Sequence, residues 1–359
     1  MNEPYFLQTK EWTDFWLGSM EKSHNITRIE IEQNDVRAWA FLYKYPWFLN
    51  QSFLYIPKGP VFEGNTLSKK KVFDAFRALV VQISKQNKEE VTFVKIELDD
   101  QVLKLLGIQN KQEVFEMINN LVSPDGKNDF SRIEVCESIK TIQYLSTMTL
   151  VLENLGKISQ LENVDMEKFF NESRDFWAKC NQKIRRYTRK SFDYGWQISY
   201  EKNQNNFEDF WRIYSETSKR QKFATHQKKY FQDLFDKDFS RMISLIDPKG
   251  KVQCSWFGVI IGNTLYYLYG GNTQDSFDNY GQYLVHVAAT YLGKKEGVSY
   301  YDLGGYDPEK GFGKFKEGYK GIIRHFGYPM DLILQARKYH FTSRFVQTAK
   351  TFRDVIPFM

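Results

Sequence analysis

Residues 265–321 constrain the fold more than any other part of the chain. They begin with an apolar run, LYYLYGG, continue with a helical pattern and a second apolar run, VSYYDL, and end in a glycine-rich stretch with several lysines. This order is typical of an α/β domain, where a loop that leaves a strand end binds anionic substrates. The segment therefore predicts an α/β (α+β) fold with a candidate anion-binding loop at Gly304–Lys320.

The length of 359 residues predicts two domains, and hydrophobic residues at 42% are ample for two cores. Aromatic residues reach 17%. This richness fits either tyrosine-lined clefts for polar ligands or heavy use of tyrosine in the core. The net charge of +6 permits an anionic partner without requiring one.

Cysteine usage and the lack of long apolar runs bear on where in the cell the protein is found. Cys136, Cys180 and Cys254 are far apart and odd in number, which favours a reducing cytoplasm. The N-terminus lacks the apolar core of a signal peptide, and no run of 18 apolar residues occurs. We therefore expect a cytoplasmic protein, with peripheral contact at the inner membrane face left open. The five histidines are scattered, so no metal is expected, and no cofactor motif appears.

Periodicity places secondary structure in both halves of the chain. In the first half it predicts helices at 8–16, 72–83 and 102–121, strands at 27–32, 38–43, 52–62 and 92–98, and a polar loop at 123–131. Pro57 and Pro60 make the run at 52–62 an edge strand or a strand end.

The second half of the chain also alternates helix and strand patterns. It predicts basic helical structure at 166–190, an amphipathic helix around 207–214, a hairpin of 252–261 and 265–269 turning at Gly262-Asn263, a helix at 284–292 closed by Gly297, and a strand at 298–303. Both halves share the order hairpin, helix, strand, so we infer a duplicated α/β unit. We expect one domain at 1–145 plus 328–359 and a second at 146–327.

Four motifs connect the chain to a known family. They are QTKEW near the start, YIPKGPVF, KIRRYTRK followed by RQKFATHQKKYFQDLF, and finally YLYGGN with YGQYLVHVAATYLGKKEGVSYYDLGGYDPEKGFGKFKEGY. In this order and spacing the sequence resembles the FemABX family of non-ribosomal peptidyltransferases over essentially its whole length.

The resemblance implies two GNAT-like domains packed around a cleft. It implies transfer of an amino acid from aminoacyl-tRNA to an amine of a peptidoglycan precursor, either UDP-MurNAc-pentapeptide or lipid II, to form the interpeptide bridge. It also implies a monomer that uses no cofactor. Some members carry a helical arm in the second domain, but only about 16 residues separate Lys190 from Phe207, so the chain is similar to the armless type.

The catalytic residues implied by the resemblance are Phe315 and Lys316. A preorganised cation beside an ester carbonyl would stabilise the oxyanion that forms when an amine attacks. The alternative is that Lys316 is a solvated loop lysine like its neighbours. Asp302 and Asp307 flank the glycine pair; either could act as a base, and either could cap a turn.

The resemblance also implies an acceptor site. Its aromatic positions correspond to Tyr230, Tyr267, Tyr269 and Tyr283, for which core packing is the alternative. Tyr267 and Tyr269 are two residues apart and are expected on one strand face. Lys58 would reach the acceptor or its phosphate, unless it is an ordinary surface lysine.

The chain departs from the family at two positions expected to be basic. His226 occupies one and Asp14 the other, with Lys228 and Lys229 close in sequence to His226. These departures leave open whether the acceptor is the UDP-linked or a lipid-linked precursor.

A cluster of cations forms the expected tRNA site: Lys183, Arg185, Arg186, Arg189 and Lys190. On a helix, four of them would share one face and could contact phosphates of an acceptor stem. The same cations would also suit lipid headgroups or a simple solvated helix face.

Two further functions stay open at this point. The first is a GNAT-like N-acyltransferase with an acyl-CoA or acyl-carrier-protein donor, although no Q/RxxGxG/A pyrophosphate loop is present. The second is a catalytically silent relative that binds RNA or membranes.

Overall fold

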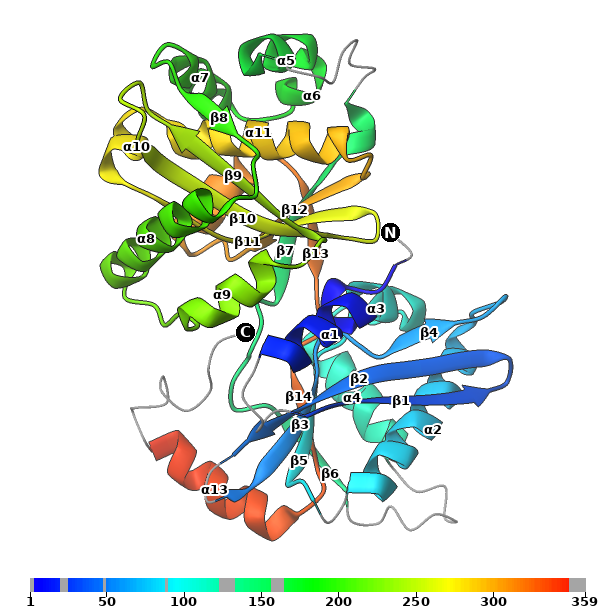
Figure 1. Ribbon diagram of the computed structural model, residues 1–359. Coiled ribbons are helices and arrows are strands. Elements are labelled where there is room, and N and C mark those ends of the chain that lie inside the picture. Colours follow the sequence, from blue (N-terminus) through cyan, green and yellow to red (C-terminus); the bar gives the residue numbers. More distant parts are fainter. Residues whose placement is uncertain are drawn as a thin grey trace. The chain divides into compact units, whose positions relative to one another are not determined.

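The computed structural model describes residues 3–19, 25–47, 50–87, 90–122, 133–155 and 165–348 (Figure 1). The polar loop predicted at 123–131 lies outside the described residues. The chain forms two compact units, Met1–Leu145 with His325–Met359, and Ser146–Arg324. No helix in the described part of the chain is both long and apolar enough to cross a bilayer.

The first unit is a mixed sheet in the order β1-β2-β3-β5-β14-β6, with β4 paired to β2. Its strands are β1 (Ile26–Gln33), β2 (Val36–Pro46), β3 (Ser52–Ile56), β4 (Val61–Glu63), β5 (Phe93–Ile96), β6 (Glu134–Glu137) and β14 (Met330–Ile333). Its helices are η1 (Phe6–Gln8), α1 (Lys10–Ser19), α2 (Lys69–Asn87), α3 (Asp100–Leu106), α4 (Lys111–Val122) and α13 (Ala336–Thr348). Strands β3 and β5 run parallel and are joined through α2.

Two elements of this unit end where a glycine or a proline stands. The single helix predicted at 102–121 is wrong, because Gly107 adopts a left-handed φ of 67° and ends α3 before α4 begins. The prolines at Pro57 and Pro60 follow the end of β3, so the strand-end interpretation is confirmed. Strand β3 itself is internal, since it pairs with both β2 and β5.

The second unit has the sheet order β13-β7-β12-β11-β10-β9-β8. Its strands are β7 (Ser146–Val151), β8 (Gln197–Ser199), β9 (Ser240–Ile246), β10 (Val252–Ile261), β11 (Thr264–Asn272), β12 (Tyr300–Gly305) and β13 (Ile322–His325). Its helices are η3 (Leu152–Asn154), α5 (Met166–Glu172), α6 (Arg174–Ala178), α7 (Gln182–Phe192), α8 (Gln204–Gln221), α9 (Lys228–Phe235), α10 (Gln274–Asp278), α11 (Gly281–Lys295) and α12 (Gly311–Glu317). Between α7 and α8 the chain forms only β8.

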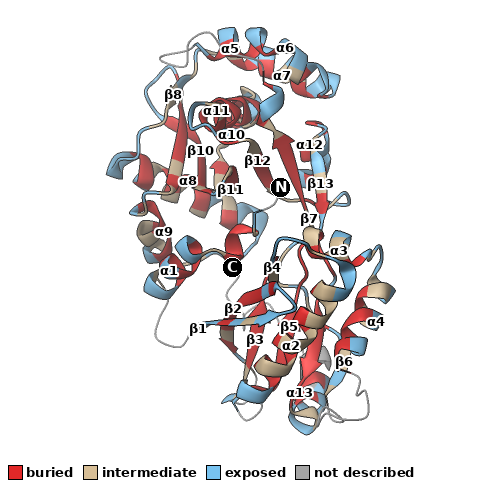
Figure 2. Cartoon of the chain, turned by 90° about the vertical axis from the view of Figure 1, so that its right-hand side faces the viewer, coloured by how far each residue is buried: buried red, intermediate tan, exposed pale blue. Residues whose placement is uncertain are grey.

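Helices cover both faces of this second sheet (Figure 1). Trp256 of β10 packs with α11 in one core, while the next residue, Phe257, lies 5.0 Å from the ring of Phe210 on α8. Helix α11 is buried around almost its whole circumference, as Figure 2 shows, because α5 and α7 pack on its outer side. A helix that is apolar on all sides needs such cover.

Both units contain the same motif, a parallel strand pair joined through a helix: β3–α2–β5 and β11–α11–β12. The predicted α/β fold with two GNAT-like domains is confirmed. The hairpin predicted around Gly262-Asn263 is present as β10 and β11, and Gly297 follows α11 with a φ of 75°.

Candidate functional site

The site is built where the parallel pairing of β11 and β12 stops. The two strands pair only at Thr264–Tyr266 with Tyr300–Asp302. Just beyond, Gly304 has a φ of 78°, and a Cβ on it would lie 2.9 Å from the main-chain oxygen of Tyr267. Only glycine combines this φ with so close a backbone contact. The glycine of the DLGG motif at position 304 therefore allows the end of β12 to lie close against the main chain of β11.

Lys316 lies beside this strand end. It was predicted on a loop, but residues 311–317 form the short helix α12. Gly313 lets this helix pack closely against residue 307, because a Cβ at position 313 would come 1.8 Å from the main-chain oxygen of Asp307. Lys316 is 8% exposed, and its Nζ donates a 2.7 Å hydrogen bond to the oxygen of Gly305.

Burial changes the protonation of Lys316. Removal from water lowers its pKa to about 8, against an opposing effect of the Asp302 carboxylate. Lys316 is thus neither a solvated lysine nor permanently charged. Near neutral pH it is still mainly an ammonium group, and that group is fixed in direction by Gly305.

Three buried side chains in the core of the second unit were not predicted, and one of them, His286, is close enough to Lys316 to feel its charge. His286 of α11 lies with its Nδ1 2.7 Å from the hydroxyl of Tyr301, which in turn accepts a 3.0 Å hydrogen bond from Nε1 of Trp256. The Tyr301 hydroxyl thus bridges the Trp256 indole and the His286 imidazole. Burial, with Lys316 as a second cause, lowers the pKa of His286 to about 3, so the ring is neutral.

Asp302 is 1% exposed and acts through the backbone. Its Oδ1 accepts a 2.7 Å hydrogen bond from the N–H of Gly304, and its Oδ2 accepts one of 3.3 Å from Thr149. Burial raises its pKa. Asp307 caps the next turn by accepting from the N–H of Glu309. Both aspartates thus have the turn-capping role that the sequence left open.

Phe315 and two of the predicted tyrosines lie around the same strand end. Phe315 has its ring centroid 5.3 Å from Tyr283 and 5.7 Å from His286. Tyr267 contacts His286 at 5.6 Å and stacks on Trp256 at 5.7 Å. These rings form the aromatic wall of the Lys316 site.

Tyr269 lies on the opposite face of the sheet, so the expectation that it shares a face with Tyr267 is wrong. The pairing register with β10 shifts between the two tyrosines, which leaves Leu268 as a β-bulge. Because the bulge adds one residue, side chains two positions apart point to opposite faces. Tyr269 instead meets Phe231 of α9 at 4.9 Å.

Tyr269 forms a second cluster with two other predicted residues. Its hydroxyl is 3.0 Å from that of Tyr230, whose ring stacks on His226 at 4.0 Å. Burial lowers the pKa of His226 to about 4, so it carries no charge at neutral pH. The nearby Lys228 and Lys229 form ion pairs with Glu208 and Asp233.

Lys58 and Asp14 both belong to the first unit. Lys58 is 2% exposed, and its Nζ lies 3.1 Å from Glu97 and 3.1 Å from the oxygen of Tyr144. The hydroxyl of Tyr55 also donates to Glu97, over 2.5 Å. Lys58 is thus part of a buried ionic cluster. Asp14 is exposed on α1 and pairs with Lys10.

The five predicted tRNA-binding cations all lie on α7, but they divide into two groups. Arg185 donates to the carbonyls of Ala178 and Cys180, and Arg189 lies 5.8 Å from the ring of Phe170. The other three, Lys183, Arg186 and Lys190, surround the rings of Tyr187 and Tyr280. The single basic face predicted from helical spacing is therefore two faces.

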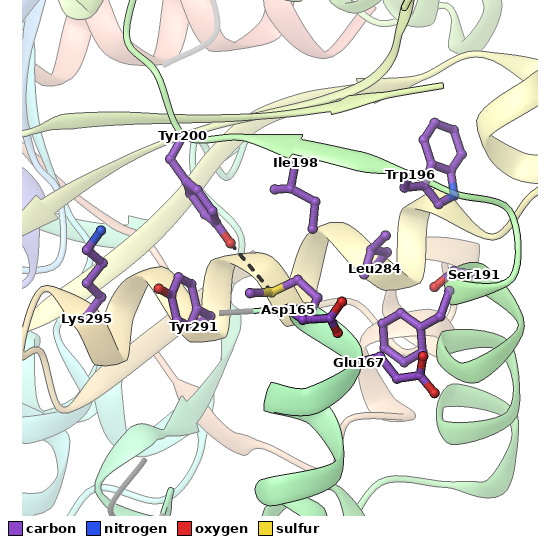
Figure 3. A pocket seen from close by; sticks show the side chains of 11 residues that line it. Asp165, Glu167, Ser191, Trp196, Ile198, Tyr200, Leu284, Tyr291 and Lys295 are labelled. Atoms are coloured by element: carbon purple, nitrogen blue, oxygen red, sulfur yellow. Dashed lines mark hydrogen bonds between the residues drawn. The ribbon is translucent and has the colours of Figure 1, made fainter. Parts of the chain in front are cut away.

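A pocket of about 540 Å³ lies between α5, β8 and α11 of the second unit (Figure 3). Tyr200, Tyr291 and Trp196 line it, and Asp165 and Lys295 also contribute. It contains none of the predicted site residues. Among the described residues, no group of three or more His, Cys, Asp or Glu side chains could hold a metal ion.

Comparison with known proteins gives matches at both sequence and fold level. A model described as the FemAB family matches residues 1–246, and a model described as an acetyltransferase (GNAT) domain matches residues 178–320. No curated protein matches the sequence.

Solved structures are similar in fold. The crystal structure of FemX has a TM-score of 0.69 at 14% identity, with 94% of each chain covered. L-PGS from Bacillus licheniformis has a TM-score of 0.49 at 10% identity, with 89% of this chain and 88% of that chain covered. A tandem GNAT protein from the clavulanic acid biosynthesis pathway has a TM-score of 0.49 at 8% identity, with 92% and 90% covered.

Proposed function

Because the chain belongs to the FemAB family and is an acyl- or aminoacyltransferase, we propose that it transfers an amino acid from aminoacyl-tRNA to an amine of a peptidoglycan precursor. The observation that carries the proposal is the buried ammonium group of Lys316, held by Gly305 at the end of β12. A fixed cation in a dry site suits a reaction that develops an oxyanion.

The proposed step is aminolysis of an ester. The acceptor amine attacks the ester carbonyl that joins the amino acid to the terminal ribose, and a tetrahedral oxyanion forms beside Lys316. Collapse breaks the carbon–oxygen bond, forms the amide and releases the ribose hydroxyl, which takes the proton lost by the amine. Lys316 stabilises charge and undergoes no covalent change.

The surrounding residues support this role for Lys316. His286 is neutral and buried, so it adds no second positive charge beside the ammonium group. The Asp302 carboxylate favours the charged form of Lys316. Phe315 and Tyr283 give the site an apolar wall, which strengthens electrostatic interactions within it.

The start of α11 favours a donor other than coenzyme A. The helix begins after Tyr280 with Gly281 and Gln282, and its first turn carries no cation. A pyrophosphate would need a glycine-rich loop of backbone N–H groups at such a helix start. The alternative with an acyl-CoA donor is supported by the match to an acetyltransferase domain. An assay with each donor in turn distinguishes the two.

The residues around His226 do not distinguish a UDP-linked from a lipid-linked acceptor. His226 is neutral, and Lys228 and Lys229 already pair with carboxylates, so none of these three provides an unpaired cation for a diphosphate. Both the UDP-linked and the lipid-linked precursor therefore belong in the assay.

The test combines the purified protein with a charged total tRNA pool and, separately, with acyl-CoA. Mass spectrometry then detects amino acid or acyl addition to soluble and lipid-linked muropeptides. Lys316→Met should reduce turnover by roughly 100- to 1,000-fold. Lys314→Met, an exposed neighbour on the same helix, is the matched control and should keep full activity.

Two results would contradict the proposal. Near-normal turnover by the Lys316→Met variant would remove Lys316 from the reaction. A product formed with acyl-CoA but with no charged tRNA would replace the donor and favour the N-acyltransferase alternative.

A further inference from the structure

A pair of stacked tyrosines lies on α7 and at the start of α11. The rings of Tyr187 and Tyr280 are 4.8 Å apart and inclined by only 10°. Both side chains are partly exposed. Tyr280 also has a left-handed φ of 61°, which a bulky residue rarely adopts. The fold thus accepts a strained backbone at the residue that completes this pair.

Three exposed cations surround the pair. The guanidinium carbon of Arg186 lies 4.6 Å from the ring centroid of Tyr187, and Lys183 lies 6.0 Å from it. Lys190 lies 5.7 Å from the ring of Tyr280. No carboxylate among the described residues forms an ion pair with any of the three, and α7 itself contains no acidic residue. The site offers planar surfaces and positive charge together.

An aromatic path connects this pair to the catalytic candidate. Tyr187 lies 5.3 Å from Tyr283, and Tyr283 lies 5.3 Å from Phe315, the residue before Lys316. The two helices at the ends of the path are also joined directly, because the N–H of Asn181 donates a 2.8 Å hydrogen bond to the oxygen of Gly318. The pair and Lys316 are therefore fixed to each other.

We infer that Arg186, Tyr187 and Tyr280 form a stacking platform for the unpaired 3′-terminal nucleotides of the RNA donor. This inference rests on the proposed function, since it assigns a subsite to the same donor. Unpaired bases stack on aromatic rings and on guanidinium planes, while lysines beside them contact the phosphates. A base-paired stem hides its base faces, so this platform selects the single-stranded end.

The test compares two RNA hairpins by fluorescence anisotropy, one with an unpaired 3′ end of four nucleotides and one blunt-ended. Tyr187→Leu should weaken binding of the first about tenfold and leave the second unchanged, because stacking is lost and the charge is kept. Arg186→Lys keeps the positive charge and changes an exposed residue. It should also weaken binding of the hairpin with the unpaired end, and it serves as the test if Tyr187→Leu does not fold. Arg189→Gln, away from the platform, should affect both hairpins alike.

Equal effects of Tyr187→Leu and Arg186→Lys on both hairpins, or no effect on either, would overturn the platform. So would binding of anionic phospholipid vesicles with no binding of either hairpin. Different results would contradict the proposed transfer reaction and the stacking platform. Platform-dependent hairpin binding without amide product from any charged tRNA would overturn the proposed function alone. Amide product with an unchanged KM for charged tRNA in both platform variants would overturn the platform alone.

Discussion

The Nζ of Lys316 donates a 2.7 Å hydrogen bond to the main-chain oxygen of Gly305, so the lysine of α12 is fastened to the end of β12. One of its three N–H groups is fixed by this contact, which leaves the remaining donors with a defined direction. Because the side chain is buried, its charge acts in a medium of low dielectric.

Transfer activity is expected to decline as the pH rises above about 8. Burial lowers the pKa of Lys316 to about 8, so its cation is lost in this range. An acceptor amine with the ordinary pKa of a lysine, near ~10.4, becomes more reactive over the same range, so the acceptor by itself would raise the rate. Initial rates at saturating substrates, measured across this range, give the profile.

The control for this profile is Asp302→Asn. The carboxylate raises the pKa of Lys316, so its removal should move the decline to lower pH. Lys314→Met should leave the profile unchanged. A rate that keeps rising through pH values well above 8 would show that Lys316 does not act as a cation.

The protein is expected to lose stability between about pH 6.5 and about pH 4 because of His226. Burial lowers its pKa from 6.5 to about 4, so the folded state stays neutral while the unfolded chain takes up a proton. This contribution is fully present above pH 6.5 and is lost as the pH falls through the window, by up to about 3 kcal/mol. Urea unfolding at several pH values measures it.

His226→Phe is the comparison variant, because it keeps a ring against Tyr230. Its unfolding free energy should fall less steeply across the same window. His286, whose pKa burial lowers to about 3, contributes in the same direction in both proteins. Identical slopes for the wild type and His226→Phe would show that His226 titrates normally in the folded protein.

Lys58→Met is expected to reduce the free energy of unfolding by about 3–5 kcal/mol, because Glu97 would be left as an unpaired buried charge. The measured quantity is the urea midpoint together with its slope. Lys44→Met, which removes a more exposed partner of Glu90, should change stability by less than about 1 kcal/mol. Unchanged stability of Lys58→Met with a raised KM for the acceptor would instead show that Lys58 contacts the substrate.

Gly271→Ala is expected to destabilise the second unit by about 1–3 kcal/mol. A Cβ there would lie 2.7 Å from the hydroxyl of Thr217 and 3.0 Å from the main-chain oxygen of Ile213, both on α8. Gly311→Ala is the control, since nothing lies within 4 Å of its Cβ position. Equal urea midpoints for the two variants would show that α8 can move away from β11 at little cost.

Much of the fold was predictable because the signals are local. The Gly262-Asn263 hairpin and the helix closed by Gly297 follow from residue types at fixed spacings, and both are present. The family resemblance, now confirmed by the model match over residues 1–246, pointed to the same architecture. These features depend on the chain's own periodicity and turn chemistry.

The placement of the site residues depended on long-range contacts instead. The bulge at Leu268 arises from pairing with β10 and sends Tyr269 to the other face. Residues 311–317 form a helix, although their glycines indicated a loop, and Gly313 packs closely against the main chain of Asp307.

The sequence by itself determined the two α/β units and pointed to Lys316 as the candidate catalytic lysine. Only the tertiary structure decided that this lysine is buried, that Gly305 fixes it, and that the neutral His286 lies near it. Burial, strand register and desolvation arise when distant segments pack together. The spacing of residues along one segment therefore does not predict them.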